Sequence, residues 1–254
     1  MNQHSQGPDQ ELDQSEPLRI PSGSRQRASA SEERPPVTAL AERDKSQTAP
    51  GVGPVVTAIV ILWLAGVVVA HYAGLLRTPP GSPPIPIFIA VTFPIAIFFA
   101  AYRAIPRFQA AVLGVDIGLV TSFQAWRVAG FVFLPLLVFG HLPGLFAWPA
   151  GLGDVAVGLA APLVAWRVVR DASFATTGAF ATFHWLGILD ASVALGTFAL
   201  ASGLIPGLTN PTTVAMAEMP LSLIPGFLVP AFLILHAVAL LKARALRWGA
   251  VVAS

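Results

Sequence analysis

The stretch GAFATFHWLGILDASVALGTFALAS, residues 178–202, decides the fold class because Asp190 is its only Asp, Glu, Lys or Arg. About 20 predominantly apolar residues are enough for a helix to cross roughly 30 Å of bilayer hydrocarbon. A helix on the surface of a soluble domain would carry charged residues along one whole face. The stretch therefore predicts a transmembrane helix.

Five further apolar segments accompany it, separated by short segments in which Pro and Gly mark turns. We predict an all-α integral membrane protein in which six transmembrane helices form an antiparallel bundle. The composition agrees, since 55% of the residues are hydrophobic and 11% are charged. The predicted spans are residues 54–76, 84–104, 117–138, 150–166, 178–202 and 221–241, within a transmembrane domain at residues 54–248.

The residues before the first span have a different composition. Residues 1–53 are rich in Gln, Ser, Pro and charged residues and show no apolar periodicity, which predicts a disordered cytoplasmic tail. Such a tail could recruit a cytoplasmic partner, and residues 249–254 are predicted to form a short C-terminal tail. Because the first apolar segment begins only at Pro54, we expect the first span to be retained rather than cleaved as a signal peptide.

The distribution of basic residues predicts the orientation of the chain. Short cytoplasmic loops of membrane proteins carry an excess of Lys and Arg. In the six-span arrangement only Arg77 lies on one side, so we predict a multi-pass protein of the plasma (inner) membrane with both termini in the cytoplasm. The basic residues on the opposite, cytoplasmic side are Arg43, Lys45, Arg103, Arg107, Arg167, Arg170, Lys242, Arg244 and Arg247.

Composition and motifs narrow the function classes. The chain has no cysteine, which excludes disulfides and cysteine-ligated metal sites. The net charge of +2 is small and its basic residues are scattered, so the predicted partner is the lipid bilayer and not nucleic acid. The absence of His-Glu-x-x-His, Gly-x-Ser-x-Gly and phosphate-loop motifs disfavours an enzyme, and no cofactor is predicted.

Three charged residues nevertheless lie well inside the predicted spans: Arg127, Asp154 and Asp190. A charge at the centre of a bilayer costs about 3 to more than 10 kcal/mol, so these groups need partners or water. Arg127 and Asp190 fall near the middle of their spans and are natural partners, whereas Asp154 falls toward the outer side. These residues are the first candidates for a functional site.

Three uncharged polar residues extend this candidate site. Gln124 lies three positions before Arg127 and projects from the same helix face. His184 and His236 fall at similar depths on the cytoplasmic side of their helix centres. The predicted ligand site therefore comprises Gln124, Arg127, Asp154, His184, Asp190 and His236.

The sequence favours a small transporter or channel-like protein that handles an anionic ligand or a proton at these residues. Two alternatives remain open. One is an intramembrane redox protein or enzyme in which His184 and His236 bind haem or a metal ion. The other is a membrane scaffold or accessory subunit in which the buried charges form structural ion pairs that fix helix register.

Overall fold

The structure, a computed structural model, describes residues 52–79 and 82–253. The predicted tail therefore lies outside the described residues, except for residues 52 and 53, which begin the first of the described helices. The described residues form helices and connecting segments without any β-strand. The principal helices are α2 (Val52–Tyr72), α3 (Ile85–Ala104), α4 (Pro106–Gly114), α5 (Ile117–Ser122), α6 (Phe133–Val138), α7 (Gly144–Arg170), α8 (Gly178–Ala199) and α9 (Val229–Ala253).

Segments of tighter or wider helical winding connect or interrupt these helices. Three of them, η1 (Phe123–Val132), η2 (Ala172–Thr176) and η4 (Thr213–Ala217), are 3₁₀-helices. Two others, η3 (Leu200–Leu204) and η5 (Ile224–Leu228), are π-helical turns. The third predicted span is thus continuous from α5 through η1 to α6, but its middle is wound as a 3₁₀-helix.

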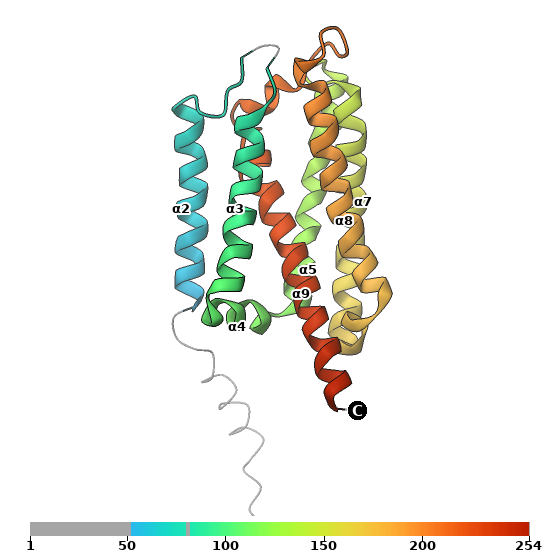
Figure 1. The fold of residues 1–254 in the computed structure, drawn as a ribbon. Coiled ribbons are helices and arrows are strands. Elements are labelled where there is room, and N and C mark those ends of the chain that lie inside the picture. Colours follow the sequence, from blue (N-terminus) through green and yellow to red (C-terminus); the bar gives the residue numbers. More distant parts are fainter. Residues whose placement is uncertain (1–51, 80–81, 254) are drawn as a thin grey trace, which may run out of the picture. The chain divides into compact units, whose positions relative to one another are not determined.

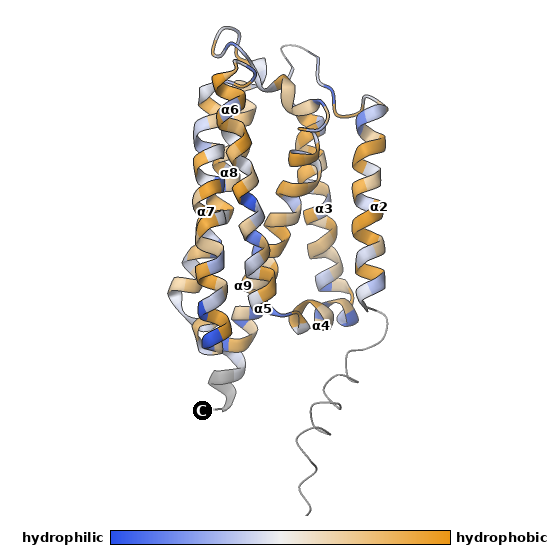
Figure 2. Ribbon diagram, turned by 180° about the vertical axis from the view of Figure 1, so that it is seen from behind, coloured by the Kyte–Doolittle hydropathy of each residue, from blue (hydrophilic) through white to orange (hydrophobic). Residues whose placement is uncertain are grey.

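Six helices in the described residues are long and apolar enough to cross a membrane, which confirms a polytopic membrane protein. They are Gly53–Tyr72, Ile85–Ala104, Ile117–Val138, Gly144–Arg170, Gly178–Leu204 and Ile224–Gly249. Hydrophobic residues dominate these helices along most of their length (Figure 2). Large apolar side chains such as Leu62, Phe93 and Leu163 remain exposed, as expected of surfaces that face lipid.

Several boundaries differ from the predicted spans. The α7 helix begins at Gly144 and runs through Pro149 to Arg170, so it includes a segment that the sequence places before the span. The α9 helix continues to Ala253, where a tail was predicted. The short helix α4 was not predicted at all; it begins at Pro106, a residue whose fixed φ suits the first turn of a helix.

Side-chain caps explain where two of the helices begin. The Asp116 carboxylate accepts a hydrogen bond from the Leu119 amide at the start of α5, and the Thr177 hydroxyl accepts one from the Phe180 amide at the start of α8. Such caps satisfy amide groups that have no partner within the helix. Each cap therefore sets the start of a helix that carries part of the candidate site.

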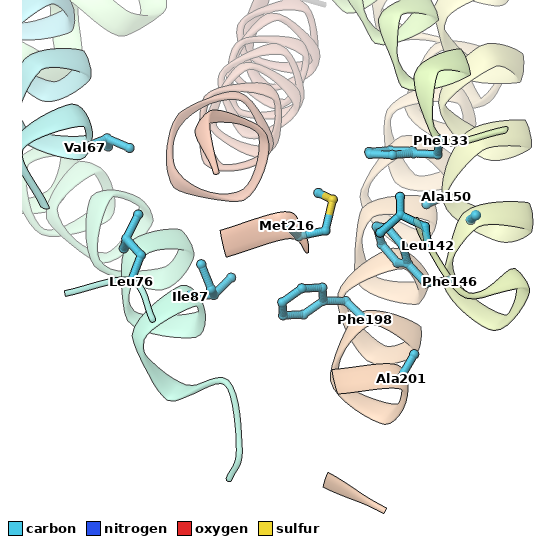
Figure 3. Packing of buried hydrophobic residues seen from close by; sticks show 11 residues of the cluster. Val67, Leu76, Ile87, Phe133, Leu142, Phe146, Ala150, Phe198, Ala201 and Met216 are labelled. Carbon is cyan, nitrogen blue, oxygen red and sulfur yellow. The ribbon is translucent and has the colours of Figure 1, made fainter. Parts of the chain in front are cut away.

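Two apolar clusters make up most of the core. The first includes Phe133, Phe146, Phe198 and Met216, together with Ile87 of α3. Figure 3 shows Met216 between the side chains of α2 and α3 and those of α6 and α7. The second cluster lies nearer α4 and includes Phe98, Val120, Phe180 and Val238. Along both the third span and α8, the candidate polar residues fall between these two clusters in the sequence.

Figure 1 shows how the helices gather around this core, with α2 and α3 on one side of α9 and α7 and α8 on the other. The α7 helix packs most extensively against η1. The candidate site thus lies where η1, α7, α8 and α9 meet.

Candidate functional site

The 3₁₀ winding of η1 aligns the polar residues of the third span. A 3₁₀-helix has three residues per turn, so every third side chain lies in one row. Every third residue from Gly118 to Phe133 is buried, and this row includes Thr121, Gln124, Arg127 and Gly130. In an α-helix the same residues would spiral away from a common line by about 60° for each step of three. Within η1 the winding therefore keeps Gln124, Arg127 and Gly130 in one line, and Thr121 at the end of α5 extends it.

Arg127 is the centre of the site. Its Nε donates a hydrogen bond to Asp154 Oδ1 of α7 at 2.7 Å, and its Nη2 donates to Asp190 Oδ2 of α8. Its Nη1 donates to the backbone carbonyl of Gly187 at 3.0 Å and lies 3.4 Å from His236 Nε2. All three nitrogens of the guanidinium group are therefore engaged by neighbouring helices.

The guanidinium and the carboxylates are not equally accessible. The Arg127 side chain is 3% exposed, whereas the Asp154 and Asp190 side chains are 21% and 15% exposed. One guanidinium contacts two carboxylates, so with all three groups ionised the site carries one excess negative charge. An incoming ligand would meet the carboxylates before the guanidinium.

Three glycines create the space that this arrangement needs. A Cβ atom at Gly130 would overlap the Asp154 side chain, and one at Gly153 would overlap the Asp190 carboxylate. A Cβ atom at Gly187 would overlap the His236 imidazole. Each glycine lets a polar side chain of a neighbouring helix pass directly against the backbone. The small-residue positions of these helices therefore accommodate side chains of the site.

The two histidines extend the network toward α5. His184 Nδ1 lies 2.8 Å from His236 Nδ1, and both side chains are fully buried. His184 Nε2 is 3.5 Å from Thr121 Oγ1, which donates to the Ile117 carbonyl at 2.7 Å. The polar residues thus form one connected chain from Arg127 to Ile117.

Donor chemistry gives this chain a direction. An arginine N–H can only donate, so His236 Nε2 is the acceptor and its proton is on Nδ1. His184 Nδ1 then accepts from His236, so the His184 proton is on Nε2 and is donated to Thr121. Because the Thr121 hydroxyl is the donor to Ile117, every hydrogen bond in the chain points the same way.

All six residues of the sequence-predicted site lie near one another, but they play different structural parts. Gln124 is fully buried, and its amide nitrogen donates to the Phe232 carbonyl at 3.2 Å; within the described segments its Oε1 has no hydrogen-bond partner. Arg127 and Asp190 pair as the sequence indicates. Asp154, expected nearer the outer side but turned toward the same guanidinium, contacts Arg127 directly.

Several residues of the network were not predicted from the sequence. Thr121 and Gly130 were not assigned to the site, although they belong to the row that begins at Gly118, in which every third residue is buried. Gly153 and Phe232 were also missed, because their contributions depend on which helices pack opposite them. The three-residue period was the available signal for the first two.

The histidine geometry bears on the haem alternative. The two Nδ1 atoms are joined by a direct hydrogen bond and the ring centroids are 5.1 Å apart, so there is no room for an iron or a porphyrin between the rings. Ligation of haem between them would require the pair to separate. Within residues 52–79 and 82–253, no group of three or more His, Asp or Glu side chains is arranged to hold a metal ion.

A cavity of about 80 Å³ adjoins the charged residues on the side of the first apolar cluster. Arg127 and Asp154 contribute the ionisable groups of its lining. The remaining wall is apolar and includes Trp126, Phe133, Phe146, Phe198 and Phe232. The cavity is large enough for several waters or a small organic group.

Comparison with known proteins places this arrangement in a family. No curated protein and no solved structure matches the chain. A family model described as "Domain of unknown function (DUF8737)" matches residues 84–244, which contain the whole charged site and begin after α2. Because this match covers more than half of the sequence, the chain belongs to the DUF8737 family.

Proposed function

We propose that this polytopic membrane protein is a small transporter whose Arg127–Asp154–Asp190 site binds and releases a proton while it handles a small ligand in the adjoining cavity. The observation that carries the proposal is the contact of one buried guanidinium with two partly exposed carboxylates. Ionisable groups held at membrane depth are costly and commonly mark proton or ion pathways. The excess carboxylate supplies a position where a proton can bind.

The same geometry supports a proton more strongly than an anion. An anionic ligand at Arg127 would need free N–H donors, but four of the five N–H groups of its guanidinium already donate within the protein. An anion would also approach the more exposed Asp154 and Asp190 carboxylates, which would repel it. The anion-binding form of the function is therefore the weaker one.

The histidine chain supports a route for the proton toward one end of the bundle. Imidazole groups donate through one nitrogen and accept through the other, so a row of them can transfer protons when each ring turns over in sequence. His236 faces Arg127, and His184 continues the row to Thr121. Because an arginine does not release its proton, the two rings would exchange a proton with a carboxylate only after Arg127 moves away from His236.

Infrared difference spectroscopy on protein in lipid vesicles tests proton binding directly. A pH titration of the wild type should show the carbonyl stretch of a protonated carboxyl group, and Asp190→Asn should lose or shift that band. Glu218→Gln is the matched control because it neutralises a carboxylate in the exposed pair with Arg77. A pH-dependent band that is identical in the wild type, Asp154→Asn and Asp190→Asn would refute the proposal.

We further propose an antiparallel bundle in the plasma membrane with both termini in the cytoplasm, on the basis of the positive-inside distribution. The absence of native cysteines makes the orientation testable. A cysteine introduced at Ser82 should react with an impermeant thiol reagent added outside the cell, whereas one at the exposed Ser173 should react only after the membrane is opened. The opposite labelling pattern would reverse the assigned orientation.

A further inference from the structure

The cavity beside Asp154 combines features that recognise one kind of ligand. Its wall is formed mainly by apolar and aromatic side chains, and Asp154 adds a carboxylate that remains 21% exposed. Arg127 also reaches the lining, but its side chain is 3% exposed and is engaged by its carboxylate and carbonyl partners. The accessible charge of the cavity is therefore negative.

We infer that this cavity binds a small organic cation, an ammonium group attached to a short aliphatic body. The inference rests on the proposed function and names the class of ligand that the site handles. The ammonium group would pair with Asp154 and supply the positive charge that balances the second carboxylate of the site. The apolar body would occupy the space between the aromatic side chains.

The aromatic lining favours a cation for a second reason. Phe133 and Phe146 pack edge to face, with ring centroids 5.2 Å apart, and Phe146 packs in the same manner against Phe198 at 6.0 Å. The faces of aromatic rings carry negative partial charge and attract cations. Arg127 itself lies over the Phe232 ring at 6.0 Å, so one wall of the cavity already holds a cation in this way.

Neutral and anionic ligands of the same shape lack part of this complementarity. A neutral molecule would fill the apolar space but leave the Asp154 carboxylate without a new partner. An anion would place like charge beside the Asp154 carboxylate, which would repel it. Cationic, neutral and anionic ligands of similar shape should therefore differ in affinity for the cavity, and a matched set of probes can test this.

Three probes with one short alkyl chain provide the test: propylammonium, 1-propanol and propionate. Each is titrated into detergent-purified protein, and the thermal unfolding midpoint is followed by tryptophan fluorescence. The ammonium probe should raise the Tm of the wild type and of Glu218→Gln, whereas the alcohol and the carboxylate should not. A ligand that binds only the folded state raises Tm as its concentration exceeds Kd.

Two variants locate the effect. Asp154→Asn removes the carboxylate and should lose the ammonium-specific shift. Ala194→Leu fills the cavity without changing a charge and should lose it as well, which keeps the test valid if the first variant unfolds. An equal shift with 1-propanol, no shift with the ammonium probe, or an undiminished shift in Ala194→Leu would overturn the inference.

The outcome is separable from that of the proposed function. The infrared measurement needs no ligand, so proton binding at Asp190 can succeed while the ammonium probe fails, and then only the ligand class is wrong. Conversely, a carboxylate-dependent ammonium shift without any protonation band would retain the cation site and refute the proton role.

Discussion

Gly158→Ala should pull α7 away from η1 and weaken the central ion pair. A Cβ atom at Gly158 would lie 2.6 Å from the Val128 backbone nitrogen, and an ordinary contact begins at 3.4 Å. The two helices must therefore separate by about 0.8 Å, because a backbone atom cannot rotate aside. Asp154 lies one turn from Gly158, so its 2.7 Å hydrogen bond from Arg127 Nε would lengthen toward about 3.5 Å, the limit of a hydrogen bond.

The expected cost is about 1–3 kcal/mol, the usual range for overpacking a well-packed interior. This exceeds the gain of up to about 1 kcal/mol that Ala brings over Gly in a helix. Gly196→Ala in α8 is the matched control, since a Cβ atom there meets nothing within 4 Å and only the helix gain remains. Denaturant unfolding in mild detergent would measure both variants. Equal or greater stability of Gly158→Ala relative to Gly196→Ala would refute the close packing of α7 on η1.

Further predictions follow from the same network. Arg127→Met should destabilise the protein by about 3–5 kcal/mol, because it leaves two carboxylates without their partner. Adding Asp154→Asn and Asp190→Asn should restore most of the lost stability. A triple variant that is no more stable than Arg127→Met would contradict this explanation. Nitrogen NMR of labelled histidines should find the His236 proton on Nδ1 and the His184 proton on Nε2, and the reverse pattern would break the directional chain. Hydrogen bonds from the Ser173 side chain and backbone lower the pKa of Asp171, so its ionised form stabilises the connection between α7 and α8 above the ordinary pKa of 3.8. Asp171→Ala should therefore lower Tm at neutral pH, and its difference from the wild type should shrink as pH falls through the lowered pKa; a constant difference down to the lowest pH would argue against this role.

The local part of the fold could be predicted from the sequence because hydropathy and length are properties of single segments. Residues 117–138 and 84–104 were predicted close to the observed helices. The start of α7 was not predicted because a proline such as Pro149 usually ends a helix, whereas here Pro149 lies within a continuous helix. A helix can lose one backbone hydrogen bond to Pro when packing on its neighbours holds it together.

The candidate site could be predicted in part, because charged residues at membrane depth need each other. Depth along the helix axis indicated the pair Arg127 and Asp190. Depth placed Asp154 nearer the outer side, but an arginine side chain reaches a partner more than one turn away, and both carboxylates contact Arg127 as expected. The positions of Gly130 and Gly153 opposite the carboxylates could not be predicted, since they depend on how α7 packs against η1 and α8.

The winding of η1 has a mechanical consequence. A 3₁₀-helix rises about 2.0 Å per residue and an α-helix about 1.5 Å, so rewinding the ten residues of Phe123–Val132 would shorten this segment by about 5 Å. Over the four positions from Phe123 to Arg127 it would also turn one side chain relative to the other by about 80°. Rewinding of this one segment would thus both shift and rotate Arg127, and would move its guanidinium away from both carboxylates at the same time.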